Sequence, residues 1–404
     1  MAAKKILEGI RIVEFGWAVV GPLTCSWAGN YGAEVIKIET STRPDIIRSM
    51  TPFVNDKYDL DNSVFFGREN ASKYSLSLNL KHPEGIALAR ELIKKSDIVL
   101  DSYTAGVMDK YGLGYPDLKR INPGIIMLSS CMYGQTGALK SMPGYGVPLT
   151  AVSGLTNLCG WPDRPPTGPY GAYTDYVVPR LNLLALVAAL DRRERTGQGT
   201  YLDASQFEGS VQFMAPALLD YEANGRVAAR MGNAAACGAP HGVYACQGAD
   251  RWCAIAVLEP AQWEGFRAAL GQPDWTDDPR FATAESRLAN QEELDRRVGE
   301  WTREREAQAV MDLMQRHGVA AGVLNTGEDL GRDPQLAHDG YYHRLAHPVM
   351  GDIEYPEHSI SFSEARQEVW PSPCLGQHTE WVCKQILGLD DARFASLRAD
   401  NVFA

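Results

Sequence analysis

Short apolar runs alternate with amphipathic segments along residues 10–130. Residues 10–15 and 33–38 predict strands, and residues 23–30 between them predict a helix. Such a unit implies parallel pairing, because parallel strands need a crossover connection. The alternation predicts an α/β fold with a doubly wound, Rossmann-like parallel sheet covered by helices on both faces. Further along, a helix, a strand, a helix and a strand are expected at residues 82–95, 98–100, 106–110 and 124–129.

The middle of the chain lacks a sustained period. Residues 135–172 are rich in Gly and Pro and are expected to form loops over an active site. An apolar helix is predicted from 177 to 195, with Pro179 in its first turn and Gly197 at its C-terminal cap. Asp175 therefore lies where a loop enters a buried helix.

The character of the chain changes again near residue 225. Two strand-like runs precede amphipathic helices, and an extended tail follows Val323 before a short helix at 379–387. A tail of this kind is expected to wrap around another body. The expected domains are a large Rossmann-like domain (1–224), a smaller α+β domain (225–325), and the tail with its helix (326–404).

Composition narrows the possible partners. The net charge of −11 over 404 residues provides no general field for nucleic acid or an anionic membrane. The eight cysteines are scattered without a CxxC pair, which is typical of reduced thiols. The first residues lack an apolar signal segment, and no apolar run approaches the ~20 residues that span a bilayer. We expect a cytoplasmic protein that binds neither nucleic acid nor membrane.

Several common chemistries lack their sequence signatures. Trp17 to Val20 occupy the turn after the first strand, so the glycine fingerprint of a dinucleotide site is missing. Glu39 is then more simply the end of a strand than a ribose ligand. The histidines form no metal-binding motif, and no Walker loop or GxSxG elbow occurs. We expect no metal site and no permanently bound cofactor.

Carboxylate chemistry remains, and Asp175 is its candidate. A carboxylate attacks an activated acyl group as a nucleophile, and the resulting anhydride keeps that group available for transfer. An aspartate at this position also suits the N-cap of the following helix. The residues alone leave these two interpretations evenly balanced.

Ordered motifs along nearly the whole chain favour the nucleophile. With them the chain resembles the class III CoA-transferases, the family of formyl-CoA transferase and carnitine CoA-transferase. The motifs are LEGIRIVEF (7–15), VGP (20–22), YGAEVIKIE (31–39), NASKYSLSLNLK (70–81), PEG (83–85), DIVL (97–100), GQTG (134–137), RTG (195–197), DPQ (333–335) and LGQHT (375–379).

The resemblance implies a covalent mechanism for Asp175. In that family the matching aspartate attacks an acyl-CoA thioester, passes through a mixed anhydride, and holds CoA as an enzyme thioester. An incoming carboxylate then leaves as the new acyl-CoA. CoA thioesters are thus substrates rather than resident cofactors, and neither ATP nor a metal is required.

The resemblance also implies a CoA site on loops at the carboxyl ends of the strands. Lys81 and Lys110 are expected to meet phosphates, and Arg43 the adenine side. A solvated surface charge stays an alternative for each lysine. The expected CoA-binding residues are Val19, Val20, Arg43, Leu78, Asn79, Leu80, Lys81, Ser102, Tyr103, Thr104, Lys110 and Tyr145.

Departures from the family pattern separate transfer from isomerisation. Family members that racemise α-methylacyl-CoA carry a histidine where this chain has Tyr145. A tyrosine, with an ordinary pKa near ~10, is a poor base at neutral pH. Transfer is therefore favoured and an acyl-CoA racemase or epimerase is the alternative. Two further departures concern loops. Gly146 replaces an aspartate common in transferases. Residues 233–240 match a glycine-rich lid of the family but are rich in alanine, which predicts a less flexible lid.

The substrates and assembly are predicted more coarsely. Residues 25–27 and 40–44 resemble the benzylsuccinate CoA-transferase branch, which favours succinyl-CoA as donor and an aromatic or branched carboxylic acid as acceptor. The family implies an interlocked homodimer. A heteromer with a related subunit, in which this chain only binds CoA, is an alternative. Aromatic residues near Asp175 favour an acyl group larger than formyl or oxalyl: Trp17, Tyr145, Trp161, Tyr173 and Tyr176.

Overall fold

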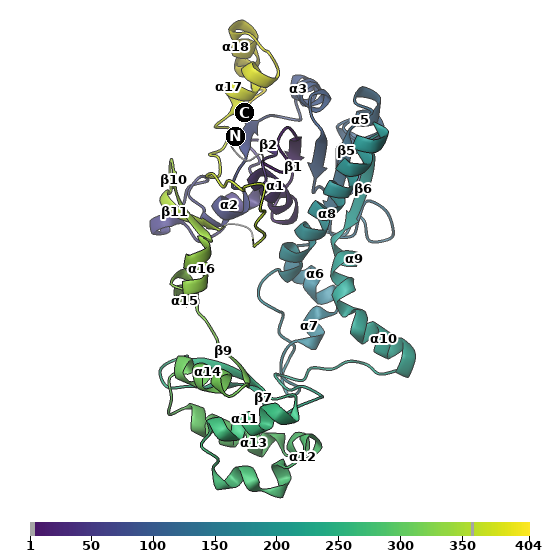
Figure 1. Ribbon diagram of the computed structural model, residues 1–404. Coiled ribbons are helices and arrows are strands. Elements are labelled where there is room, and N and C mark those ends of the chain that lie inside the picture. Colours follow the sequence, from purple (N-terminus) through teal and green to yellow (C-terminus); the bar gives the residue numbers. More distant parts are fainter. Residues whose placement is uncertain (1–4, 357–358) are drawn as a thin grey trace. The chain divides into compact units, whose positions relative to one another are not determined.

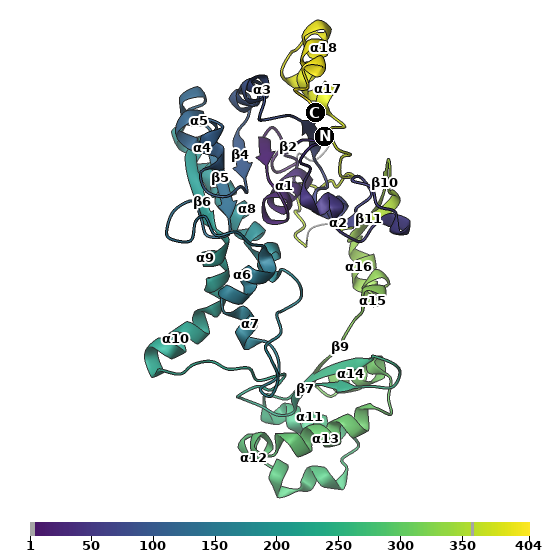
Figure 2. The same cartoon turned by 180° about the vertical axis from the view of Figure 1, so that it is seen from behind.

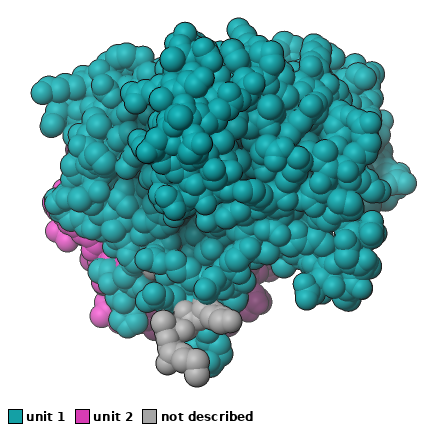
Figure 3. All heavy atoms as spheres, turned by 90° about the horizontal axis from the view of Figure 1, so that it is seen from above, with its two compact units in different colours: residues 1–156, 168–226, 337–404 teal, residues 157–167, 227–336 magenta. Residues whose placement is uncertain are grey.

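The computed structural model describes residues 5–356 and 359–404 (Figures 1 and 2). Contacts between residues divide the chain into two compact units, coloured separately in Figure 3. Unit 1 comprises residues 1–156, 168–226 and 337–404. Unit 2 comprises residues 157–167 and 227–336. The short segment 157–167 thus belongs with residues far from it in sequence.

A six-stranded, fully parallel sheet forms the centre of unit 1. The strand order is β3-β2-β1-β4-β5-β6, so the winding direction reverses between β1 and β4. The predicted Rossmann-like sheet is confirmed. Its strands are β1 (Arg11–Phe15), β2 (Glu34–Glu39), β3 (Tyr74–Ser77), β4 (Ile98–Asp101), β5 (Ile126–Cys131) and β6 (Thr200–Ser205).

Helices cover both faces of this sheet, as the alternating pattern predicted. On one face, α1 (Val20–Asn30) and α8 (Tyr173–Thr196) bury Cys25, Leu186 and other apolar residues against the strands. The other face carries α3, α5 and the C-terminal helices, whose buried residues join one apolar core. These elements are α3 (Pro83–Lys94), α5 (Tyr115–Ile121), α17 (Thr379–Trp381), the π-helical turn Val382–Ile386 and α18 (Asp391–Ala399).

The long helix α8 begins earlier than predicted. It starts at Tyr173 rather than at 177, so Pro179 lies inside the helix and the prediction of a first-turn proline is wrong. Asp175 lies in the first turn, where its negative charge suits the helix dipole. At the other end Gly197 caps the helix as predicted, with a φ of 68° and its N–H donated to the Arg193 carbonyl.

Other short elements were not predicted. The segment 135–172 contains α6 (Gly146–Val152) and α7 (Leu155–Leu158), so its description as loop is wrong in part. The tail contains a hairpin of β10 and β11, and residues 370–379 then return to β3. The remaining elements of unit 1 are α2 (Val64–Glu69), α4 (Val107–Lys110), α9 (Gln206–Val211), α10 (Ala215–Asn224), α16 (Pro334–Asp339, which overlaps the boundary of unit 2), β10 (Tyr342–His347) and β11 (Gly351–Pro356).

Unit 2 is a small α+β body, as its sequence pattern predicted. An antiparallel sheet in the order β7-β8-β9 packs with helices around a separate apolar core. The expected lid, residues 233–240, and the aromatic Trp161 both belong to this unit. Its elements are β7 (His241–Ala245), β8 (Trp252–Ala256), β9 (Ala320–Val323), α11 (Pro260–Ala269), α12 (Ala284–Ala289), α13 (Gln291–Thr302), α14 (Ala307–Arg316) and α15 (Gly327–Gly331).

Candidate active site

The carboxyl ends of β1 and β4 meet at the point where the winding of the sheet reverses, which is the usual ligand position in such folds. A hollow of about 140 Å³ opens there, which we call the nucleophile hollow. Asp175 is in its wall, together with the turn after β1 and the loop after β5. Its lining residues are Trp17, Ala18, Val19, Val20, Ser102, Thr104, Ser130, Cys131, Met132, Tyr133, Lys140, Met142, Pro143, Gly144, Tyr145, Gly146, Asp175 and Gln206.

Asp175 is half-buried in this hollow. Gln206, the first residue of α9 and itself buried, donates a hydrogen bond from Nε2 to Asp175 Oδ1. Burial raises the pKa of Asp175 to about 6, although the Gln206 hydrogen bond favours the charged form. Asp175 is thus a carboxylate at pH 7 without a cationic partner among the described residues, an environment that suits a nucleophile.

Gly146 leaves the space in which the Asp175 carboxyl group lies. A Cβ atom at position 146 would come within 2.4 Å of Asp175 Oδ2 and 2.5 Å of Ala172 Cβ. Both distances are far below van der Waals contact. Glycine is therefore the residue that lets α6 begin directly beside the first turn of α8.

Buried side chains clamp the turn between β1 and α1. Asp45 Oδ1 accepts the Ala18 N–H at 3.0 Å, where Ala18 holds a φ of 62° that a non-glycine residue rarely adopts. Lys37 Nζ lies 3.0 Å from Asp45 Oδ2, with both side chains fully buried. Ser102 Oγ accepts the Trp17 N–H at 2.7 Å and donates to the Trp17 carbonyl at 3.1 Å. The turn is therefore held by hydrogen bonds from both Asp45 and Ser102.

A second hollow of about 250 Å³ follows the carboxyl ends of β2, β3 and β4, and we call it the basic hollow. It shares Trp17 and Thr104 with the nucleophile hollow, so the two adjoin. The Arg43 guanidinium lies 4.4 Å from the centre of the Trp17 ring, and Lys81 is also in the wall. An elongated, anionic ligand fits this arrangement of cations beside the nucleophile.

The two hollows collect most of the predicted site residues. Lys110 is the exception, because it is exposed at the end of α4 and lines neither hollow. The nucleophile hollow contains Val19, Val20, Ser102, Thr104, Tyr145 and Asp175. The basic hollow contains Arg43, Leu78, Asn79, Leu80, Lys81, Tyr103 and Thr104.

The sequence did not indicate Gln206 or Lys140 as site residues, and no motif marks either. Of the aromatic residues expected around Asp175, Trp17 and Tyr145 line the nucleophile hollow. Tyr176 lines a different cavity, and Tyr173 lines neither hollow.

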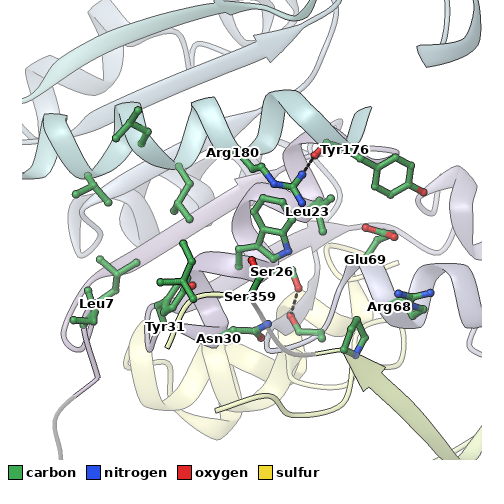
Figure 4. A pocket seen from close by; sticks show the side chains of 18 of the residues that line it. Leu7, Leu23, Ser26, Asn30, Tyr31, Arg68, Glu69, Tyr176, Arg180 and Ser359 are labelled. Atoms are coloured by element: carbon green, nitrogen blue, oxygen red, sulfur yellow. Dashed lines mark hydrogen bonds between the residues drawn. The ribbon is translucent and has the colours of Figure 1, made fainter. Parts of the chain in front are cut away.

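Tyr176 lines a larger cavity of about 770 Å³ between α1, α8 and residues of 341–356 and 359–362 (Figure 4). Asp175 is not among its lining residues, so its size does not identify it as the reaction site. Its walls are mostly apolar, with Leu23, Tyr31 and other large side chains. The buried Glu69 also lines it, and burial raises the pKa of this carboxyl to about 7.

The described residues contain neither a candidate metal site nor a helix suited to a membrane. Within residues 5–356 and 359–404, no group of three or more His, Cys, Asp or Glu side chains is placed to hold a metal ion. In the same part of the chain, no helix combines the length and apolar character needed to cross a membrane.

The doubly wound sheet, with joined hollows at its switch point, is typical of an enzyme whose substrate extends along the carboxyl edge of the strands. Comparison with known sequences is more specific. Residues 7–379 match the profile of CoA-transferase family III, and the chain belongs to that family. It is a CoA-transferase, and the resemblance expected from its motifs is confirmed. The benzylsuccinate branch stays a prediction.

Individual relatives extend over the whole chain. Succinyl-CoA–D-citramalate CoA-transferase of Chloroflexus aurantiacus is 30% identical over 397 residues, covering 98% of each chain. The succinyl-CoA–L-malate CoA-transferase beta subunit of the same organism is 30% identical over 410 residues, again covering 98% of each chain. The crystal structure of a CAIB/BAIF family protein from Brucella suis superposes with a TM-score of 0.87 at 29% identity, covering 95% of this chain and 100% of that one.

Proposed function

We propose that this CoA-transferase takes CoA from succinyl-CoA and passes it to a small carboxylic acid through a thioester on Asp175. The position of Asp175 carries the proposal: it is a half-buried carboxylate without a cationic partner among the described residues, in a hollow that adjoins a basic one. The names of both relatives specify succinyl-CoA as the donor.

Each step exchanges one activated acyl bond for another. The Asp175 carboxylate attacks the thioester carbonyl, a C–O bond forms, and the C–S bond breaks to release the CoA thiolate. The thiolate attacks the aspartyl carbonyl of the anhydride, which expels succinate and leaves CoA on Asp175. The acceptor carboxylate then attacks the aspartyl thioester, which forms a second anhydride and releases the CoA thiolate. The thiolate attacks the acceptor carbonyl of this anhydride, which gives the new acyl-CoA and restores the Asp175 carboxylate.

The environment of Asp175 suits this sequence. A raised pKa makes the carboxylate a stronger nucleophile, while a value of about 6 keeps it ionised at neutral pH. Gln206 holds one oxygen and leaves the other directed toward Gly146, at the wall of the hollow. Backbone N–H groups of the adjoining glycine-containing loop are candidates to stabilise the oxyanion.

For the acceptor we propose a short branched acid. A hollow of about 140 Å³ suits a few carbon atoms, and one relative is named for citramalate, a branched acid. An aromatic acceptor stays the alternative. Measuring transfer from succinyl-CoA to branched, linear and aromatic acids at equal concentration separates the two.

Racemisation is the second candidate reaction, and the lining of the nucleophile hollow disfavours it. A two-base reaction at the α-carbon needs a second group poised near neutral pH. None of the described residues that line the hollow is a histidine, and Tyr145 occupies the expected position. Exchange of the α-proton of a branched acyl-CoA with deuterated water tests this reaction.

We propose a homodimer, interlocked as in other class III enzymes. Apolar side chains that the chain leaves exposed on α8 and α10 support an extended interface: Leu181, Leu184, Val187, Leu218, Leu219 and Tyr221. A heteromer is the alternative, because one relative is named as a subunit. Light scattering at micromolar concentration is expected to give twice the chain mass, and a monomer would contradict the proposal.

Trapping the covalent intermediate tests the mechanism. The protein is incubated with succinyl-CoA, treated with hydroxylamine or borohydride, and digested for mass spectrometry. Modification is expected at Asp175 and in no peptide of the Asp175→Asn variant. Full transferase activity in Asp175→Asn would show that the carboxylate is not the nucleophile.

A further inference from the structure

The nucleophile hollow contains a single basic side chain among the described residues that line it. That residue is Lys140, in the loop after β5. Apart from Asp175, every other lining residue is uncharged. The cations of the basic hollow, Arg43 and Lys81, line a different part of the site.

Lys140 is also free of protein partners. Its side chain is exposed, and the described residues provide neither an ion pair nor a hydrogen bond to its Nζ. Many of the other lysines and arginines are paired with carboxylates. Of the described lysines that are not, Lys140 alone lines the nucleophile hollow. A cation in the wall of the hollow that contains the nucleophile, with no carboxylate of its own, is available to a substrate anion.

We propose that Lys140 binds the second carboxylate of a dicarboxylic substrate, so that it selects succinyl over uncharged acyl groups and dicarboxylic over monocarboxylic acceptors. This inference rests on the proposed function, because it places the reacting carbonyl at Asp175. A succinyl group carries its free carboxylate two methylene groups beyond the thioester carbonyl. The flexible four-carbon stem of lysine reaches such a group from the wall of a hollow of about 140 Å³.

The alternative role for the Lys140 ammonium group is to bind a phosphate of CoA. The two roles differ in one measurable respect. A phosphate contact serves every acyl-CoA equally, whereas a contact to the second carboxylate serves only acyl groups that have one. Succinyl-CoA and butanoyl-CoA share the CoA moiety and chain length and differ at this terminal group.

The experiment compares these two thioesters in the purified full-length enzyme. For the wild type, Lys140→Met and Lys140→Arg, kcat/KM is measured with succinyl-CoA, and the inhibition constant of butanoyl-CoA is measured by competition. Lys140→Met is expected to lower kcat/KM for succinyl-CoA at least tenfold and to leave the inhibition constant of butanoyl-CoA within twofold. Lys140→Arg is expected to retain most of the activity. Lys57→Met, which removes an exposed lysine outside both hollows, is the matched control.

Two outcomes would overturn the inference. Equal weakening of both thioesters would assign Lys140 to the CoA moiety, and no change in either would show that it does not contact the substrate. Failure of the proposed function is recognised separately, because trapping with the wild type reports modification at Asp175 whatever the selectivity of Lys140. A selectivity change without modification at Asp175 would support the role of Lys140 and show that Asp175 is not the nucleophile.

Discussion

Gly146 and Asp175 fit together so closely that a Cβ at position 146 would lie 2.4 Å from Asp175 Oδ2. Gly146 is the first residue of α6, and Asp175 is in the first turn of α8. The two helix starts are thus held side by side through a contact that only glycine permits. The position of the nucleophile depends on a residue that carries no functional group.

Gly146→Ala is therefore expected to displace the Asp175 side chain and lower kcat by at least about 100-fold, since reacting atoms must be held in a narrow range of geometries. Transfer kinetics and trapping at Asp175 measure the effect. The control is Gly299→Ala, because a Cβ at this position of α13 meets nothing within 4 Å. Wild-type kinetics in Gly146→Ala would contradict the tight fit.

A second prediction concerns pH. Only the ionised form of Asp175 is a nucleophile, and burial raises its pKa to about 6. The value of kcat/KM is expected to be constant above pH 7 and to fall tenfold per pH unit well below 6. A midpoint near 4, the ordinary value for an aspartate, would show that Asp175 is better solvated than the structure indicates.

Gln206 gives a way to move that midpoint. Its hydrogen bond favours the charged form of Asp175, while burial opposes it. Gln206→Met keeps the length of the side chain and removes the donor. The acid limb of the kcat/KM profile is expected to shift to higher pH, and Gln206→Glu, which adds a second carboxyl group, is expected to shift it further. An unchanged midpoint in both variants would show that Gln206 does not interact with the reacting form.

The sequence predicted some strands of the sheet and missed others. Strands β1, β2, β4 and β5 are apolar runs and were predicted within a few residues. Strand β3 was missed, because its sequence, YSLS, has no apolar run. Residues distant in sequence complete it, since Ser77 N–H donates to Thr379 Oγ1 at 3.0 Å.

The candidate site shows the same division. Asp175 was found because it lies where a Gly- and Pro-rich segment enters a predicted helix and because the family resemblance implies a nucleophile at this position, whereas Gln206 comes to it only through the pairing of β6 with β5. No residue of β6 is fully buried, and its sequence, TYLDAS, has no apolar run, so its hydrophobic signal is weak. Lys140 lies in a segment without a period, so its place in the wall of the nucleophile hollow depends on the path of a loop.

The last prediction concerns Glu69 and stability. Its carboxyl group is buried, Oε2 has no hydrogen-bond partner, and burial raises its pKa to about 7. A carboxyl group with a raised folded-state pKa favours folding most below its unfolded pKa, and that contribution is lost as pH rises through about 7. Glu69→Gln is neutral at every pH and avoids this loss. At pH 8 the free energy of unfolding of the variant is expected to be roughly 1–3 kcal/mol higher than that of the wild type, and near pH 5 the two are expected to differ little.

Urea unfolding at both pH values measures the difference. Asp400→Asn, which removes an exposed carboxyl group at the end of α18, is the control and is expected to show no such dependence. A constant difference between wild type and Glu69→Gln across this range would mean that the pKa of Glu69 is the same in the folded and the unfolded protein.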